Sequence, residues 1–235
     1  ASPAASAGAA RAVARQSQCA NAQKQLGLAM HTYAADHKQA VVSSQMWQVE
    51  NPAGNGYIWH EVLSSYIYNQ FMNGFEMWDG PAKQSAGRSP FWGCPEWDRT
   101  TMNTPTNPAL FNGFGISVWL EPRAAFGKPP NEIGVNIYGK GWAPGSAGYN
   151  PGTPGYLFSM DQVANFIQPS KRIILGPSKH FYLQPNAISN PNPNLHQPFR
   201  HAGPEGGVGN YLYLDGHVTS LTREKSAFQI RTPNG

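Results

Sequence analysis

The sequence predicts an α+β fold, in which one long N-terminal helix packs on a mostly antiparallel sheet with long loops. Residues 9–38 contain no proline and are rich in strong helix formers. Several short stretches in the remainder alternate between apolar and polar residues, as strands do. The segments between them are rich in Gly, Pro and Asn, which is typical of loops. With 235 residues the chain is large enough to bury a core.

The predicted N-terminal helix has one narrow apolar face. Ala22, Leu26 and Ala29 recur at steps of three and four residues and so share one side of the helix. The first half of the helix is lined with small residues such as Ala12 and Ala20. We therefore predict that the second half lies on a sheet while the first half projects. The small residues would let neighbouring helices approach closely. We therefore predict an assembly face on this helix that comprises Ala12, Ala20, Ala22, Leu26 and Ala29.

The remaining residues, 39–235, are predicted to form a globular α+β head that ends in a β-hairpin. Apolar periodicity predicts the following elements: helices at Tyr57–Tyr68 and Ser159–Phe166, strands at Phe114–Leu120, Ile133–Gly139 and Arg172–Leu175, and a hairpin of Asn210–Leu214 with His217–Leu221. Asp215-Gly216 is a strong signal for a two-residue hairpin turn. Gly139–Tyr156 is predicted to be a long Gly/Pro loop. Residues 1–8 are interpreted as a disordered lead or a cloning remnant.

Composition argues against several classes of function. Charged residues make up only 13% of the chain, and the net charge of +4 arises from scattered Lys and Arg. Without a basic run, we expect no nucleic-acid partner. No nucleophile elbow, zinc-protease or phosphate-cradling motif is present, so we expect no enzymatic activity.

Three segments resemble pseudopilin-like proteins with a prepilin-type N-terminus and a C-terminal His-x(n)-Asp-Gly domain. The first is the helical run that contains Cys19, and the second is the Cys-Pro segment at Cys94. The third supplies the family motif near the C-terminus: Arg200, His201, Gly203, Asn210, Asp215, Gly216 and His217. Thirteen residues separate His201 from Asp215, more than in the family pattern, and we interpret the additional residues as a longer turn.

This resemblance implies a pilin-like fold and a location in the cell envelope, periplasm or surface of a bacterium. It further implies that a membrane-inserted half of the helix is missing upstream of residue 1. The full-length protein would then be anchored in the inner membrane and assemble with copies of itself or with other pseudopilins. We expect a structural subunit of a filament or of a type II secretion-like assembly.

The resemblance also covers the two cysteines, Cys19 and Cys94. They are expected to form a disulfide in an oxidising compartment, and the alternative is two free, buried thiols. We expect no cofactor. A zinc site at His201, Asp215 and His217 is a minor alternative, since imidazole and carboxylate are zinc ligands. Calcium, known for major pseudopilins, would find few acidic residues in the last third of the chain.

The rival hypothesis is a pilin-anchored surface protein that binds a carbohydrate or another ligand. Seven tryptophans are present, and Trp78, Trp97 and Trp142 fall in loop-type sequence. Aromatic rings in loops stack on sugars or on partner proteins. The alternative is that these rings are local anchors of large loops.

Overall fold

The computed structural model describes residues 3–37, 42, 45–46, 57–72, 94–96, 113–117, 168–178, 182–183, 196–197, 199–203 and 206–231. Helix α1 (Pro3–Asp36) is 34 residues long, or about 51 Å at the usual rise. It begins at Pro3, where proline suits the first turn of a helix. Residues 3–8 form the first turns of this helix, and their Ala-rich sequence favours that conformation.

The main sheet has five strands in the order β5-β3-β4-β6-β7. Their bounds are Tyr182–Leu183 for β5, Phe114–Ser117 for β3, Ile173–Pro177 for β4, Gly209–Tyr213 for β6 and Val218–Leu221 for β7. From β3 to β7 all pairs are antiparallel, whereas β5 runs parallel to β3. The predicted α+β class with a mostly antiparallel sheet is therefore confirmed.

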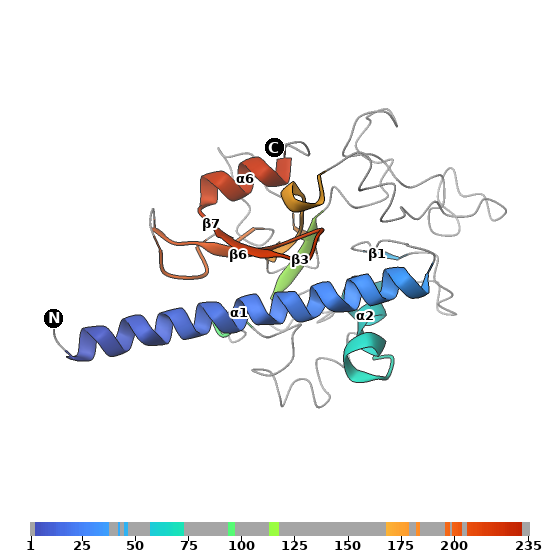
Figure 1. The fold of residues 1–235 in the computed structure, drawn as a ribbon, viewed down its shortest axis with the longest axis horizontal. Coiled ribbons are helices and arrows are strands. Elements are labelled where there is room, and N and C mark those ends of the chain that lie inside the picture. The colour runs from blue at the N-terminus through green and yellow to red at the C-terminus, as the bar shows by residue number, and fades with distance from the viewer. Residues whose placement is uncertain are drawn as a thin grey trace, which may run out of the picture.

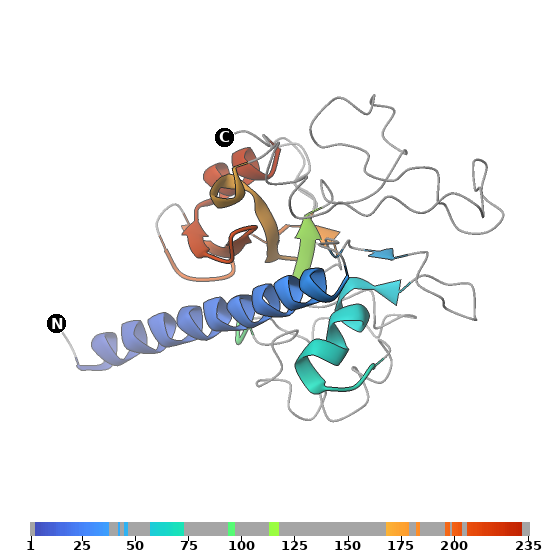
Figure 2. The same ribbon diagram turned by 45° about the vertical axis from the view of Figure 1, so that its right-hand side comes forward.

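Helices cover both faces of this sheet (Figures 1 and 2). Helix α1 crosses one face, and α6 (Arg223–Arg231) lies over the other. Strand β6 serves both sides, because Leu212 packs in the core beneath α1 while Tyr211 packs in the smaller core on the other side. At Gly27, α1 passes so close to β6 that an added Cβ would lie 3.0 Å from Leu212 Cδ1.

Helix α2 (Trp59–Tyr68) packs against the C-terminal half of α1, close to its predicted bounds. Trp59 and Leu63 are completely buried between the two helices and the sheet. Two short strands, β1 (Gln45–Met46) and β2 (Tyr57–Ile58), pair with each other just before α2. The 3₁₀ turn η4 (Pro169–Lys171) leads into β4.

The C-terminal hairpin forms as predicted, but its turn differs. The Gly216 amide donates to the carbonyl of Tyr213 (2.9 Å), so Leu214 and Asp215 are the central residues. Gly216 has φ +88°, and Asp215 does not enter the positive region. The connection is a three-residue loop ending in a left-handed glycine, and the prediction of a two-residue Asp-Gly turn is wrong.

Several of the described elements were not expected from the sequence, among them β1, β2, β5 and α6. Strand β5 has only two residues, too few for a detectable alternation. Helix α6 is predominantly polar and lacks a clear apolar stripe. Other predictions fall outside the described residues: the strand at Ile133–Gly139, the helix at Ser159–Phe166 and the loop at Gly139–Tyr156.

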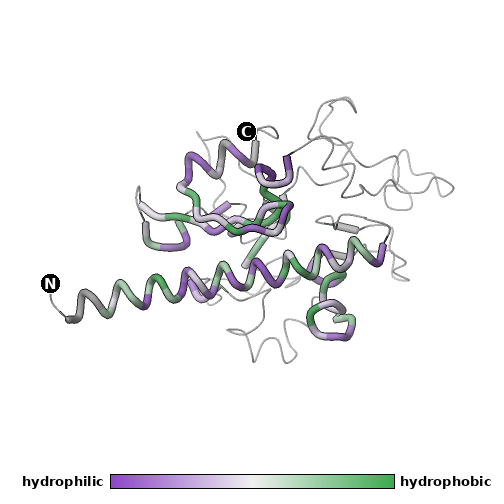
Figure 3. Tube along the Cα trace, in the orientation of Figure 1, coloured by the Kyte–Doolittle hydropathy of each residue, from purple (hydrophilic) through white to green (hydrophobic). Residues whose placement is uncertain are grey.

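The hydropathy of α1 changes sign repeatedly along its length (Figure 3), with polar residues between the apolar ones. Within the part of the chain that the structure describes, no helix combines the length and the apolar character needed to span a membrane.

Candidate functional site

Three segments that are far apart in the sequence meet at one buried point beside α1. Cys19 lies in the middle of α1, Cys94 starts the turn of residues 94–96, and His201 pairs with Val208 across a loop. Their exposed fractions are 0%, 2% and 4%. Cys94 Sγ lies 3.7 Å from His201 Nε2, and the three ligand atoms all lie within 4.8 Å of one another. Each of the three sequence motifs contributes one member of this cluster.

The two thiols of the cluster are electrostatically coupled. A hydrogen bond between the sulfur atoms raises the pKa of Cys19 and lowers that of Cys94. Burial raises the pKa of both thiols, while His201 and the positive charge of Arg200 lower that of Cys94. Both cysteines are thiols in this structure, and the disulfide between them stays a prediction.

The backbone around His201 is held in a closed loop. The amides of His201 and Val208 each donate to the other residue's carbonyl at 2.9 Å. Gly206 and Gly207 have φ of +87° and +139° and supply the conformations that the loop requires. At Gly203 an added Cβ would lie 2.8 Å from Val208 Cγ1. The described residues between His201 and β6, including Gly206 and Gly207, thus lie ahead of the hairpin itself.

A second group of motif contacts ties α1 to strands β6 and β7. Asn210, only 1% exposed, donates from Nδ2 to the carbonyl of Gln16 (2.9 Å) and accepts at Oδ1 from Ser220 Oγ (2.7 Å). The carbonyl of Asn210 accepts from Nε2 of Gln23 (2.7 Å), and Gln16 Nε2 donates to Ser220 Oγ (2.7 Å). We call these four residues the Asn210 network.

Sequence reasoning singled out Asn210 but missed its three partners. One signal was available: Gln23 lies four residues after Cys19, on the apolar side of the helix. A long polar side chain in that stripe needs a buried partner.

Arg200 fixes the ends of two strands. Its guanidinium donates to the carbonyl of Gly113, just before β3, and to that of Ser178, just after β4 (3.0 Å for the latter). It also donates to Gln197 Oε1 and lies 5.9 Å from the ring centre of Phe114. The motif residues Arg200, His201 and Asn210 therefore share one role, which is to join the strand ends, the 94–96 turn and α1.

An ion pair adds a surface connection at the same junction. Arg15 of α1 lies 3.1 Å from Glu96 Oε1, with side chains 53% and 30% exposed. A pair this exposed contributes little to stability. The ion pair nevertheless forms a direct contact between the 94–96 turn and α1.

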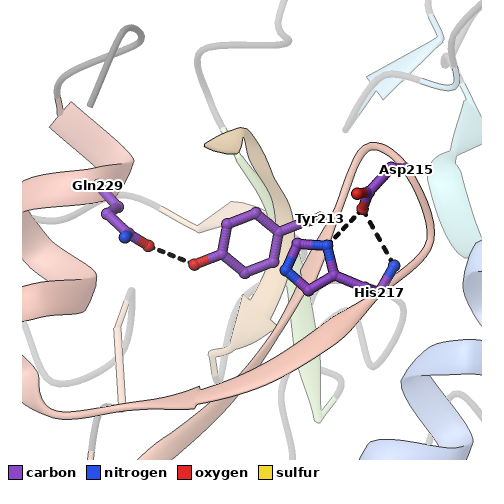
Figure 4. Close-up of polar contacts among 4 residues, drawn as sticks. All are labelled: Tyr213, Asp215, His217 and Gln229. Carbon is purple, nitrogen blue, oxygen red and sulfur yellow. Dashed lines mark hydrogen bonds and ion pairs between the residues drawn. The ribbon is translucent and has the colours of Figure 1, made fainter. Parts of the chain in front are cut away.

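Asp215 and His217 form a separate group at the tip of the hairpin (Figure 4). Asp215 Oδ1 accepts from the backbone amide of His217 (3.1 Å) and pairs with its ring Nδ1 (2.5 Å). The imidazole stacks on Tyr213, with ring centres 4.1 Å apart, and the Tyr213 hydroxyl donates to Gln229 Oε1 of α6. Burial, assisted by the charge of Asp215, raises the pKa of Tyr213 to about 12.

The three residues considered as a zinc site from the sequence, His201, Asp215 and His217, therefore do not come together in the structure. Asp215 and His217 contact each other, but His201 joins the two cysteines instead. The register of the hairpin explains the difference, because His201 lies ahead of β6 while Asp215 lies beyond its other end.

The predicted assembly face of α1 is largely turned toward the domain's own core. Ala22, Leu26 and Ala29 are 6%, 0% and 5% exposed, and Ala12 and Ala20 are half-buried. These three residues belong to the hydrophobic core formed by α1, α2 and the sheet, so the assembly role predicted for them falls on a face that this core already uses. A periodic apolar stripe marks a buried face and does not tell which partner buries it.

The tryptophans proposed to stack on a ligand, Trp78, Trp97 and Trp142, lie outside the described residues. Binding of a carbohydrate stays a prediction.

Comparison with known families adds one finding. Residues 8–117 match the family model described as a protein of unknown function (DUF1559), a family of prepilin-type, pilin-like proteins. The matched segment contains α1, Cys19 and Cys94. No curated protein and no solved structure matches the chain significantly.

Proposed function

From the match of residues 8–117 to a family of pilin-like proteins, we propose that this protein is a pseudopilin-like structural subunit of a bacterial cell-envelope assembly. The subunits associate through the side of α1 that faces away from the sheet. We call this side the outer face; it comprises Ala10, Val13, Ser17, Asn21, Lys24 and Leu28, which are all exposed and recur at steps of three and four residues.

The proposal is supported by the exposed apolar side chains of the outer face. Among the described residues, the two most exposed large hydrophobic side chains are Leu28 (70%) and Val13 (63%), and both lie on it. Removing each from water would contribute roughly 1.5–3 kcal/mol to association. The N-terminal half of α1 also extends beyond the sheet (Figures 1 and 2), where a neighbouring helix has access.

The contacts at the junction suit a subunit that transmits force. The Asn210 network and the cluster of Cys19, Cys94 and His201 hold α1 against the head at two places. A helix that is used for assembly must be fixed to the head that it carries, because a loose connection would let the two parts move independently.

The proposal is tested in the bacterium that makes the full-length protein. A photo-crosslinking amino acid at Leu28 is expected to capture another pilin-type subunit. The same amino acid at Ser170, an exposed residue of η4 on the far side of the sheet from α1, is the control. Equal capture at both sites, or none at Leu28, contradicts the proposal.

Charge substitutions provide the second readout. Leu28→Glu and Val13→Glu are expected to abolish assembly, whereas Ser170→Glu adds the same charge and leaves assembly intact. Because all three positions are exposed, each variant should unfold within about 0.5 kcal/mol of the wild type. Assembly that survives Leu28→Glu and Val13→Glu together refutes the outer face as the contact surface.

A further inference from the structure

We propose that Cys19, Cys94 and His201 form a buried zinc-binding site. The site would link α1, the 94–96 turn and the loop before β6 through one metal ion. The cluster consists of two thiols and one imidazole, and these are the side chains that zinc prefers in structural sites.

The spacing of the ligand atoms fits one tetrahedral ion. With Zn–S near 2.3 Å and Zn–N near 2.0 Å, a sulfur and a nitrogen on the same zinc lie about 3.5 Å apart. Cys94 Sγ and His201 Nε2 are 3.7 Å apart, and no pair of atoms in the cluster exceeds 4.8 Å. Only small side-chain adjustments would bring all three into coordination.

Burial and charge also favour a cation at this point. The three side chains are at most 4% exposed, and a buried thiolate requires a compensating charge. Two thiolates would neutralise a divalent zinc ion, so that the occupied site carries no net charge. Hard cations such as calcium require oxygen ligands, and this cluster offers none.

Regular backbone structure holds two of the three ligands in position. Cys19 is held within the continuous helix α1, and His201 is fixed by two backbone hydrogen bonds to Val208. Preorganised ligands lose little freedom when the metal binds. The described residues supply three ligands, and a water molecule would complete the tetrahedron.

Zinc and a disulfide are mutually exclusive at this site, because both require the same two sulfur atoms. A disulfide would use only the two sulfur atoms, whereas a zinc ion would also bind the His201 imidazole. The oxidation state of the cysteines therefore discriminates between the two alternatives.

The first experiment uses the protein isolated from its bacterium without added reductant or chelator. We expect about one zinc per chain by elemental mass spectrometry, and two cysteines that react with an alkylating reagent after denaturation. A disulfide-bonded pair without zinc overturns the proposal. This measurement requires no variant and so does not depend on whether a substituted protein folds.

The second experiment titrates cobalt(II), as a spectroscopic probe for zinc, into the reduced protein without oxygen. Thiolate-to-cobalt charge-transfer absorption and tetrahedral d–d bands should saturate at one cobalt per chain and disappear when zinc is added. His201→Ala and Cys94→Ser should weaken cobalt binding at least tenfold. His217→Ala, which alters the exposed histidine of the hairpin, should leave it unchanged. A folded, fully reduced wild type that shows no such bands refutes the site, as does equal weakening by His217→Ala.

Discussion

Replacing Asn210 with alanine should loosen α1 from the sheet. The Asn210 side chain is 1% exposed and makes hydrogen bonds of 2.9 Å to the Gln16 carbonyl and 2.7 Å to the Ser220 hydroxyl. At about 1 kcal/mol of net stabilisation each, their loss should lower the free energy of unfolding by about 2 kcal/mol. For a chain of this size, this corresponds to a decrease in Tm of roughly 4–8 °C.

The assay is urea unfolding followed by far-ultraviolet circular dichroism, which reports on α1, and by tryptophan fluorescence, to which the buried Trp59 contributes. Ser220→Ala is the matched control, because it removes only the hydroxyl at the exposed end of the same network. Ser220→Ala should lower the free energy of unfolding by less than about 1 kcal/mol. The double variant should lose less stability than the sum of the two single variants. An Asn210→Ala protein within about 0.5 kcal/mol of the wild type would refute the assigned role of this network.

Two further predictions concern the core. Gly176→Ala would place a Cβ 2.6 Å from Tyr211 Cδ1 and 2.8 Å from Leu183 Cδ2. Overpacking should therefore lower the free energy of unfolding by about 1–3 kcal/mol. Thermal unfolding measures this loss, and an unchanged Tm contradicts the prediction. Burial lowers the pKa of His60 to about 3, below its ordinary value of 6.5. Neutral His60 therefore supports folding above about pH 6.5, and stability should fall by up to roughly 1.4 kcal/mol per unit as the pH drops toward the folded pKa. His60→Gln should flatten this pH dependence of stability. A variant whose stability changes with pH in the same way as the wild type would contradict the assignment to His60.

Elements with strong local patterns were predictable from the sequence. The N-terminal helix, the helix at Tyr57–Tyr68 and the C-terminal hairpin all form close to their predicted positions. In each, the propensity and apolar period of neighbouring residues determine the structure. The type of hairpin turn was not predictable, because Asp-Gly suits both a two-residue turn and a three-residue loop with the glycine at its end.

The candidate site was predictable only in part. The sequence identified Cys19, Cys94 and His201 as members of separate motifs but assigned His201 to a different group. Cys94 and His201 are 107 positions apart, and Gln23 and Asn210 are 187 apart. Contacts over such separations depend on the paths of the loops between them, which no local pattern encodes.

The sequence by itself thus determined the segments with strong local patterns, such as the N-terminal helix, and which side of α1 is apolar. Only the tertiary structure decided which apolar side chains of α1 stay outside the core, among them Leu28 and Val13. It also decided that two cysteines and a histidine from three distant segments share one buried point. The reason is physical: periodicity reports that a face is buried, whereas the identity of the covering surface follows from the packing of the whole chain.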